Sequence, residues 1–208
     1  MHVFGLTGGI ASGKSAVAAR FRERGVPIVD ADALSREVVA PGSEGLARVA
    51  EAFGKEFVAS DGTLDRKKLA AEVFGDDDKV KKLNAIMHPR IAMLGARKTA
   101  ELAARGEPLA CYEAALLVEN GLADAFRPLV VVSAPLDVQV ARARARDAAD
   151  EASVRARIAA QLPLADKTRV ADVVVQNDGT LDDLRARADD ALDEVCRRVG
   201  VDPARYPR

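Results

Sequence analysis

A glycine-rich segment near the start of the chain has the residue types and the spacing needed to hold phosphate groups. Residues 8–15 read Gly-Gly-Ile-Ala-Ser-Gly-Lys-Ser and match the pattern G-x-x-x-x-G-K-[ST] in full. An apolar run before the pattern predicts a strand, and helical spacing of apolar residues after it predicts a helix. Strand, loop and helix in this order are the context in which the pattern holds a nucleotide. A turn that only starts a helix is the alternative, but it leaves the lysine and the serine unexplained.

Each part of this loop has an expected role. Backbone N–H groups of a glycine-rich turn, together with the positive end of the helix dipole, can surround the β- and γ-phosphates of ATP. Lys14 adds a positive charge beside the reacting oxygens, and the Ser15 hydroxyl is placed to ligate Mg²⁺. The motif alone does not choose between a GTPase, an ATPase and a small-molecule kinase. The expected nucleotide-binding residues are Gly8, Gly9, Ile10, Ala11, Ser12, Gly13, Lys14 and Ser15.

Two aspartates follow the second predicted strand. Asp30 and Asp32 lie where open α/β proteins bind their ligands, at the carboxyl edge of the sheet. On an extended chain, side chains spaced by one residue share a face, so one carboxylate could take a proton from an attacking hydroxyl while the other orients a metal-bound water or caps a helix. We expect Asp32 to be the base. The alternative for Asp32 is a plain helix N-cap.

Further charged residues have spacing that suits phosphoryl chemistry. Glu113 ends a predicted strand and could hold Mg²⁺ through a water molecule, although a solvated carboxylate is the alternative. Arg142 and Arg146 lie four residues apart on a predicted helix and so share a face. Two guanidinium groups on one side could stabilise the charge that develops on the phosphoryl oxygens. Solvated helix arginines are the alternative here.

The elements that would position these residues alternate between strand and helix. Five apolar runs, each bounded by proline, glycine or polar residues, predict buried strands with helical segments between them. This alternation indicates an α/β fold of the P-loop NTPase type, with three layers around a doubly wound, parallel, five-stranded sheet. The expected strands are residues 3–7, 26–30, 109–112, 129–133 and 173–176.

Two helical excursions interrupt this pattern. Residues 33–106 predict a helical substrate-binding insertion, and residues 135–169, dense in arginine and alanine, predict a helical lid. His88-Pro89 is expected to separate two helices of the insertion, because the residue before proline avoids the helical region. After a last helix at 182–199, the polar tail is expected to fray. The nucleotide-binding core would comprise residues 1–32, 107–134 and 170–208, and the insertion helices residues 43–53, 65–74, 77–87 and 89–105.

Composition excludes several classes of protein. The 208 residues carry 31 Lys and Arg against 32 Asp and Glu, so no overall positive charge favours nucleic acid as a partner. No run approaches the about 18 apolar residues of a membrane span, and no signal peptide is evident. Cys111 and Cys196 have no partner at metal-ligand spacing, and we expect buried thiols in a cytoplasmic protein. A monomer or a weak homo-oligomer is expected.

Taken together, these residues resemble the dephospho-coenzyme A kinases, with matching order and spacing over about residues 1 to 180. The resemblance implies ATP-dependent phosphorylation of the ribose 3′-hydroxyl of dephospho-coenzyme A, with Mg²⁺ as cofactor and these two small molecules as substrates. The matching residues are the run from Gly5 to Ser15, then Asp30, Ala31, Asp32, His88, Pro89, Leu116, Leu117, Val118, Glu119, Arg142, Arg146, Asp147, Gln161, Lys167, Ala171, Asp172 and Asn177.

The resemblance also implies roles for individual residues. It places the base at Asp32 and puts His88, Leu116 and Glu119 beside the acceptor. It puts Asn177 beside the adenine and supports Arg142 and Arg146 as contacts of the transferring phosphoryl group, with Arg142 also on the nucleotide. Two positions, Ala115 and Val118, depart from the family pattern and bear on the shape of the acceptor pocket. No role is implied for Arg144, Arg155 and Arg157.

Two other functions stay open at this point. One is a P-loop kinase of another small metabolite, such as a nucleoside or a shikimate-like or gluconate-like acceptor. The other is a nucleotide-dependent switch or binding protein, in which an ordered lid alters a partner surface. Residues 175–179 read Val-Gln-Asn-Asp-Gly, where a guanine-specific switch protein usually carries Asn-Lys-x-Asp. The missing run and the aspartate pair both count against the switch.

Overall fold

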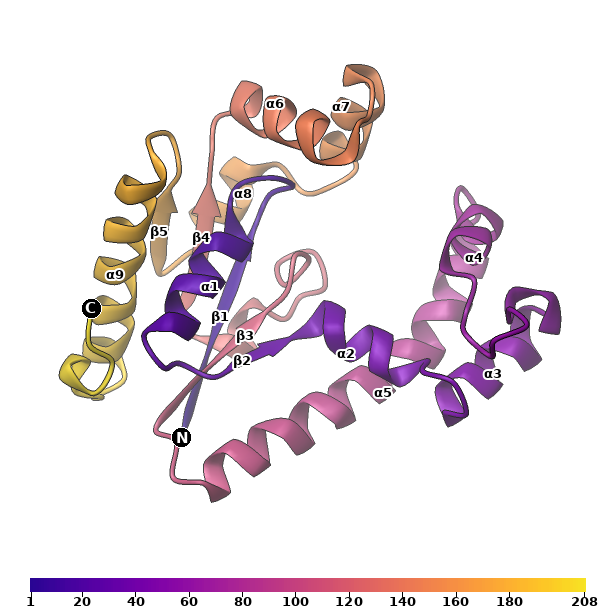
Figure 1. The fold of residues 1–208 in the computed structure, drawn as a ribbon, viewed down its shortest axis with the longest axis horizontal. Coiled ribbons are helices and arrows are strands. Elements are labelled where there is room, and N and C mark those ends of the chain that lie inside the picture. Colours follow the sequence, from indigo (N-terminus) through magenta and orange to yellow (C-terminus); the bar gives the residue numbers. More distant parts are fainter. The chain divides into compact units, whose positions relative to one another are not determined.

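The computed structural model describes all residues from Met1 to Arg208. The chain divides into two units, of which the first comprises Met1–Val29 and Leu102–Arg208 and the second comprises Asp30–Glu101. The first unit contains the β-sheet, and the second is built mainly of helices (Figure 1). None of the helices combines the length and the apolar character needed to cross a membrane.

The sheet has the strand order β2-β3-β1-β4-β5. Its central strand β1 pairs in parallel with both β3 and β4, and β4 pairs in parallel with β5. Because the chain returns to each side of β1, the loop that follows this strand lies at the point where the winding of the sheet reverses. The expected doubly wound, parallel α/β sheet is confirmed. Its strands are β1 (His2–Gly8), β2 (Ile28–Asp30), β3 (Leu109–Glu113), β4 (Leu129–Ser133) and β5 (Val173–Gln176).

Helices α1 (Lys14–Glu23) and α9 (Leu181–Arg198) cover one face of this sheet (Figure 1). Their apolar side chains join those of the strands in one buried cluster, in which the rings of Phe4 and Phe21 meet edge to face at 5.7 Å. The opposite face carries Gly5, where a Cβ would lie 3.0 Å from the carbonyl oxygen of Phe126. The 3-10 helix η2 (Ala123–Phe126) therefore packs against bare backbone. The remaining helices of this unit are α6 (Leu136–Asp147), α7 (Glu151–Ala159), α8 (Leu164–Arg169) and the 3-10 helix η3 (Pro203–Arg205).

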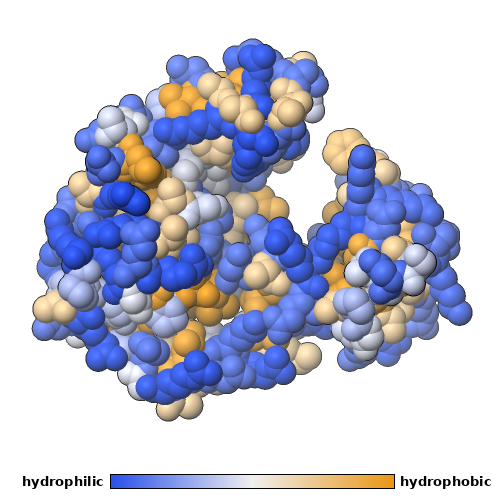
Figure 2. All heavy atoms as spheres, viewed as in Figure 1, coloured by the Kyte–Doolittle hydropathy of each residue, from blue (hydrophilic) through white to orange (hydrophobic).

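The surface is mainly hydrophilic (Figure 2), and both cysteine thiols are buried. Hydrophilic residues dominate the face drawn in Figure 2, and apolar side chains form scattered patches between them. Cys111 and Cys196 are free and buried, as expected. Burial raises the pKa of both thiols, so neither is set up as a reactive thiolate.

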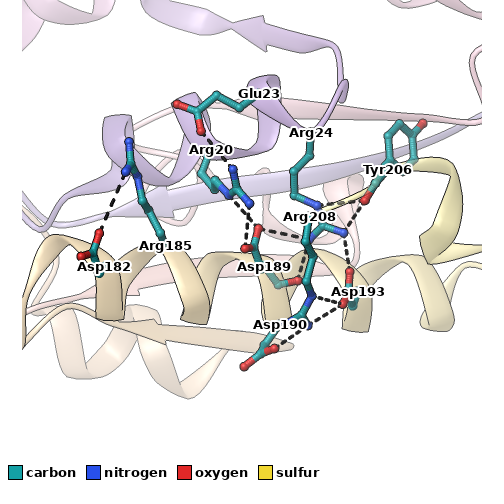
Figure 3. A network of polar contacts seen from close by, with 10 residues as sticks. All are labelled: Arg20, Glu23, Arg24, Asp182, Arg185, Asp189, Asp190, Asp193, Tyr206 and Arg208. Carbon is teal, nitrogen blue, oxygen red and sulfur yellow. Dashed lines mark hydrogen bonds and ion pairs between the residues drawn. The ribbon is translucent and has the colours of Figure 1, made fainter.

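The carboxyl-terminal tail packs against α1 and α9, and the prediction that it frays is wrong. Tyr206 is buried, and its carbonyl oxygen accepts a hydrogen bond of 2.9 Å from Arg24 Nε. The Arg24 guanidinium, with 1% of its side chain exposed, also donates to the carbonyl of Asp189 at 2.8 Å and to the carboxylate of Asp193 at 2.6 Å (Figure 3). A buried guanidinium needs all its donors satisfied, and the tail supplies one of the acceptors.

The second unit is a helical insertion, as expected. Its helices are α2 (Ala31–Val38), α3 (Glu44–Phe53), the 3-10 helix η1 (Lys55–Phe57), α4 (Arg66–Val73) and most of α5 (Asp77–Ala104). Leu46, Val49, Phe57 and Leu69 form the centre of its own apolar cluster. A unit with its own core can keep its internal structure without help from the sheet.

Helix α5 runs through the position where we expected a break. The predicted helices 77–87 and 89–105 are one helix, with Pro89 inside it. Proline removes one backbone hydrogen bond from a helix, but Arg90 donates a side-chain bond of 2.9 Å to the Ile86 carbonyl in the same turn. Ile86 and Ile91, on both sides of the proline, pack on the same apolar cluster. Packing of the helix face therefore outweighs the local preference to end at His88.

Candidate active site

The loop from Gly8 to Lys14 has the backbone shape that its sequence predicts. Gly13 has a φ of 100°, and a Cβ there would lie 2.1 Å from Asn177 Nδ2. A Cβ on Gly8 would lie 2.7 Å from the carbonyl oxygen of Val132. Both positions therefore require glycine. Gly13 also begins α1 without a side-chain cap, which leaves the first backbone N–H groups of the helix for an anion.

Lys14 and Glu113 form an ion pair beside this loop. Lys14 Nζ lies 2.6 Å from Glu113 Oε1, and the two side chains are 13% and 8% exposed. The parallel register of β1 and β3 places Glu113 opposite Leu6, just before the loop. The carboxylate thus holds the ammonium group at the phosphate side of the loop. Ser15 follows in the first turn of α1 with an exposed side chain.

These residues fit the needs of Mg²⁺. Magnesium bound with a nucleotide takes few oxygen ligands from the protein and keeps waters and phosphate oxygens as the others. The Ser15 hydroxyl could be a direct ligand, and Glu113 has a second carboxylate oxygen that could accept from a metal-bound water. The chemistry of this donor pair is therefore suitable for Mg²⁺.

Asn177 connects the loop to helix α6. Its amide Nδ2 donates a bond of 2.8 Å to the Ser12 carbonyl, and the residue is buried. Arg142 donates to Asn177 Oδ1 at 3.2 Å and to the Asn177 carbonyl at 3.4 Å. Both ends of the amide are thus bonded to the protein. The structure brings together Ser12, Arg142 and Asn177 of the expected nucleotide-binding residues.

Arg146 has different surroundings from Arg142. Arg146 Nε lies 2.7 Å from Asp147 Oδ1, and the Arg146 side chain is exposed. Arg157 also donates to Asp147, at 2.8 Å. The hydrogen bonds from Arg146 and Arg157 hold the pKa of the Asp147 carboxyl well below its usual range. The structure therefore does not place Arg146 at the loop with Arg142.

Two residues that follow α7 contact distant parts of the first unit, and one of them reaches the loop. Gln161 Oε1 accepts from the Ile10 backbone N–H at 3.2 Å. Lys167 Nζ lies 2.6 Å from Glu119 Oε1. The family pattern includes Gln161 and Lys167, but their sequence positions assign them no role. No signal in one sequence shows that residues 151 positions apart will touch.

The second unit contains Asp32, the expected base, and the neighbouring Asp30. Asp30 is the N-cap of α2, and its Oδ1 accepts from the backbone N–H groups of Asp32 at 2.8 Å and Ala33 at 3.2 Å. The chain turns into a helix at Ala31, so the expectation that the two carboxylates share a face of an extended chain is wrong. The alternative that Asp32 is the helix N-cap is also wrong, because Asp30 is the N-cap. Asp32 is exposed, and its carboxylate makes no hydrogen bond or ion pair within the protein. Such a carboxylate is free to accept a proton. His88 is also exposed, on α5.

Comparison with known proteins gives consistent matches over nearly the whole chain. The family model of dephospho-CoA kinase matches residues 2–183. A dephospho-CoA kinase of Anaeromyxobacter dehalogenans is 49% identical over 211 residues, which cover 99% of this chain and 100% of the relative. A crystal structure of a Thermus thermophilus protein is similar with a TM-score of 0.80 and 36% identity, over 93% of this chain and 97% of the other. A dephospho-CoA kinase structure from Campylobacter jejuni, at 22% identity and a TM-score of 0.63 over 93% of this chain and 97% of the other, supports the fold alone.

Proposed function

This chain belongs to the dephospho-CoA kinase family, and we propose that it transfers the γ-phosphoryl group of ATP to the ribose 3′-hydroxyl of dephospho-coenzyme A, the last step of coenzyme A synthesis. The observation that carries the proposal is the phosphate loop, in which Lys14 is held by Glu113 and the Ser12 carbonyl by Asn177. A loop fixed in this way needs little rearrangement to bind phosphate, apart from the Ile10 N–H, which must exchange its bond to Gln161.

The residues divide the chemistry between them. The loop amides and Lys14 bind the β- and γ-phosphates, and Arg142 stabilises charge on the transferring group. Asp32 accepts the proton of the 3′-hydroxyl as its oxygen bonds to the γ-phosphorus and ADP leaves. The Ser15 hydroxyl and, through a water molecule, Glu113 would hold Mg²⁺, which would supply positive charge beside the phosphate oxygens. Arg146 would join Arg142 only if α6 changes its contacts.

The wider assignments follow from the same activity. Residues 33–106 would bind dephospho-coenzyme A with His88 facing it, and Leu116 would contact the same substrate from the core. Residues 135–169 would act as the lid that excludes water during transfer. Asn177 would shape the adenine side of the nucleotide site.

Mass spectrometry of the product tests the proposal. Incubation with ATP and dephospho-coenzyme A should yield a product heavier by one phosphate, with fragmentation that places it on the ribose. Shikimate, gluconate and nucleosides in the same ADP-release assay should give no more than background. Slow ATP hydrolysis that none of the acceptors accelerates would instead support a nucleotide switch.

A further inference from the structure

A fully buried ammonium group lies on helix α8, away from the phosphate loop lysine. The side chain of Lys167 is 0% exposed, and its Nζ lies 2.6 Å from Oε1 of Glu119, whose side chain is 18% exposed. The same Nζ donates to the carbonyl of Ala115 at 3.2 Å. Buried ion pairs often add little net stability over apolar residues of the same volume. The segments that this ion pair holds together are therefore more informative than its contribution to the free energy of unfolding.

The pair joins three segments that are distant in sequence. Glu119 Oε1 also accepts from the Leu162 backbone N–H at 3.3 Å, in the return from α7. The Ala115 carbonyl also accepts from Thr7 Oγ1 at 3.1 Å, at the end of β1. The stretch 115–119 is thus held from the strand that precedes the phosphate loop and from α8. Leu116 lies in the middle of this stretch and is exposed.

The Glu119 carboxylate is engaged within the protein. Its Oε1 already serves Lys167 and Leu162, and its Oε2 is buried without a hydrogen-bond partner. Oε2 is therefore closed to a soluble substrate, and Oε1 is already used by two donors within the protein. The carboxylate is placed to hold the stretch 115–119 and not to touch an acceptor.

We propose that Glu119 and Lys167 are positioning residues: their buried pair fixes the stretch 115–119, and with it Leu116, for binding of dephospho-coenzyme A. The inference rests on the proposed function. Lys167 acts through Glu119 and the Ala115 carbonyl and reaches no substrate. Lys167 bonds to the backbone carbonyl of Ala115. The side chain at this position departs from the family pattern, but the bond to the carbonyl does not depend on it.

A set of three variants tests this proposal: Glu119→Gln, Lys167→Met and the double variant. Each single change leaves one buried partner unmatched, whereas the double change leaves two neutral side chains of similar size. We expect each single variant to raise the KM for dephospho-coenzyme A about tenfold and the double variant to return it to within about threefold of the wild type. The KM for ATP should change less than about threefold in all three variants, because Asn177 and Glu113 hold the loop independently.

Several results would overturn the proposal. A double variant that keeps the raised KM of Glu119→Gln would show that the carboxylate contacts the acceptor itself. Single variants that lose only stability or kcat, with both KM values unchanged, would show a merely structural pair. If a single variant does not fold, the KM of the double variant decides between these outcomes.

The control variant is Arg169→Met, on the same helix. Arg169 pairs with Asp166 at 2.9 Å, and its side chain is 75% exposed. We expect its loss to leave both KM values and the melting temperature unchanged, since exposed pairs contribute little. A wild-type protein that does not phosphorylate dephospho-coenzyme A would disprove the proposed function. An active wild type whose double variant stays impaired would disprove this inference alone.

Discussion

The two units of the chain hold their polar residues in different ways. In the first unit, Arg24, Lys167 and Asn177 are buried and bonded to residues far away in the sequence. In the second unit, ion pairs such as Lys79–Glu72 and Lys98–Glu37 are exposed, and an apolar cluster provides the core. The first unit therefore has buried polar contacts between distant segments in addition to its apolar core, whereas these ion pairs of the second unit lie at its surface.

The same contrast applies to the chemical groups. Lys14 is already paired in the first unit, but Asp32 of the second unit has no partner within the protein. We therefore expect changes around the loop to alter ATP binding, and changes at Asp32 to alter turnover alone.

The largest effect is expected for Lys14→Ala. Its loss removes the charge beside the β- and γ-phosphates and leaves Glu113 without its partner. We expect kcat to fall about 10²- to 10³-fold, with weaker ATP binding as well. Steady-state kinetics and ATP titration measure the two effects. Tight ATP binding with normal turnover in this variant would refute the role given to Lys14.

Asn177→Ala tests whether the loop depends on a distant amide. The change leaves the Ser12 carbonyl and the Arg142 guanidinium without their bonds to the amide. We expect the KM for ATP to rise about tenfold. Asp178→Ala, which removes a neighbouring exposed partner of Arg187, is the matched control and should change little. Equal KM values in the two variants would exclude Asn177 from positioning the loop.

Arg24→Met separates stability from chemistry. Its removal leaves Asp193 with one fewer partner and the Tyr206 carbonyl without its donor. We expect a loss of about 3–5 kcal/mol in the free energy of unfolding, with unchanged turnover per folded molecule. Denaturant unfolding measures this loss. Arg185→Met, which affects an exposed pair of 4.0 Å on the same face (Figure 3), should cost less than about 0.5 kcal/mol. Similar losses in both variants would contradict the conclusion that Arg24 stabilises the fold by bonding to Asp193 and to the Tyr206 carbonyl.

Ala11→Gly should have the smallest effect. Ala11 has a φ of 55°, a left-handed conformation that costs a non-glycine residue about 1 kcal/mol. Glycine relieves this cost but loses more entropy on folding, so we expect a gain of at most about 1 kcal/mol in unfolding free energy. Ala19→Gly, in the middle of α1, should instead lose about 1 kcal/mol. A clear loss at position 11 would show that the left-handed backbone costs nothing there.

The sequence predicts the parts of this protein that depend on local order. The five strands and the phosphate loop follow from apolar runs and from glycines whose positions the structure explains, such as Gly8 and Gly13. The helical insertion also follows, because its segments have helical spacing. In each case the signal lies within about ten residues of the chain.

The remaining features depend on contacts between distant residues. Helix α5 continues through Pro89 because its apolar face packs on both sides of the proline. The tail is ordered because Arg24 needs an acceptor at Tyr206, 182 positions away. Asp30, not Asp32, caps α2 because the chain turns into helix at Ala31, two residues earlier than a cap at Asp32 would imply. A family resemblance can name such residues, but only their tertiary contacts give them roles.

The most direct test of the role proposed for Asp32 is to measure both ATP affinity and kcat in the variant Asp32→Asn. This change keeps the size of the side chain and removes its ability to take a proton. We predict a kcat lower by about 10²- to 10⁴-fold with ATP affinity unchanged, because the role proposed for Asp32 is to activate the hydroxyl and not to hold the nucleotide. A kcat close to that of the wild type would contradict the assignment of Asp32 as the base, and with it the division of labour between the two units.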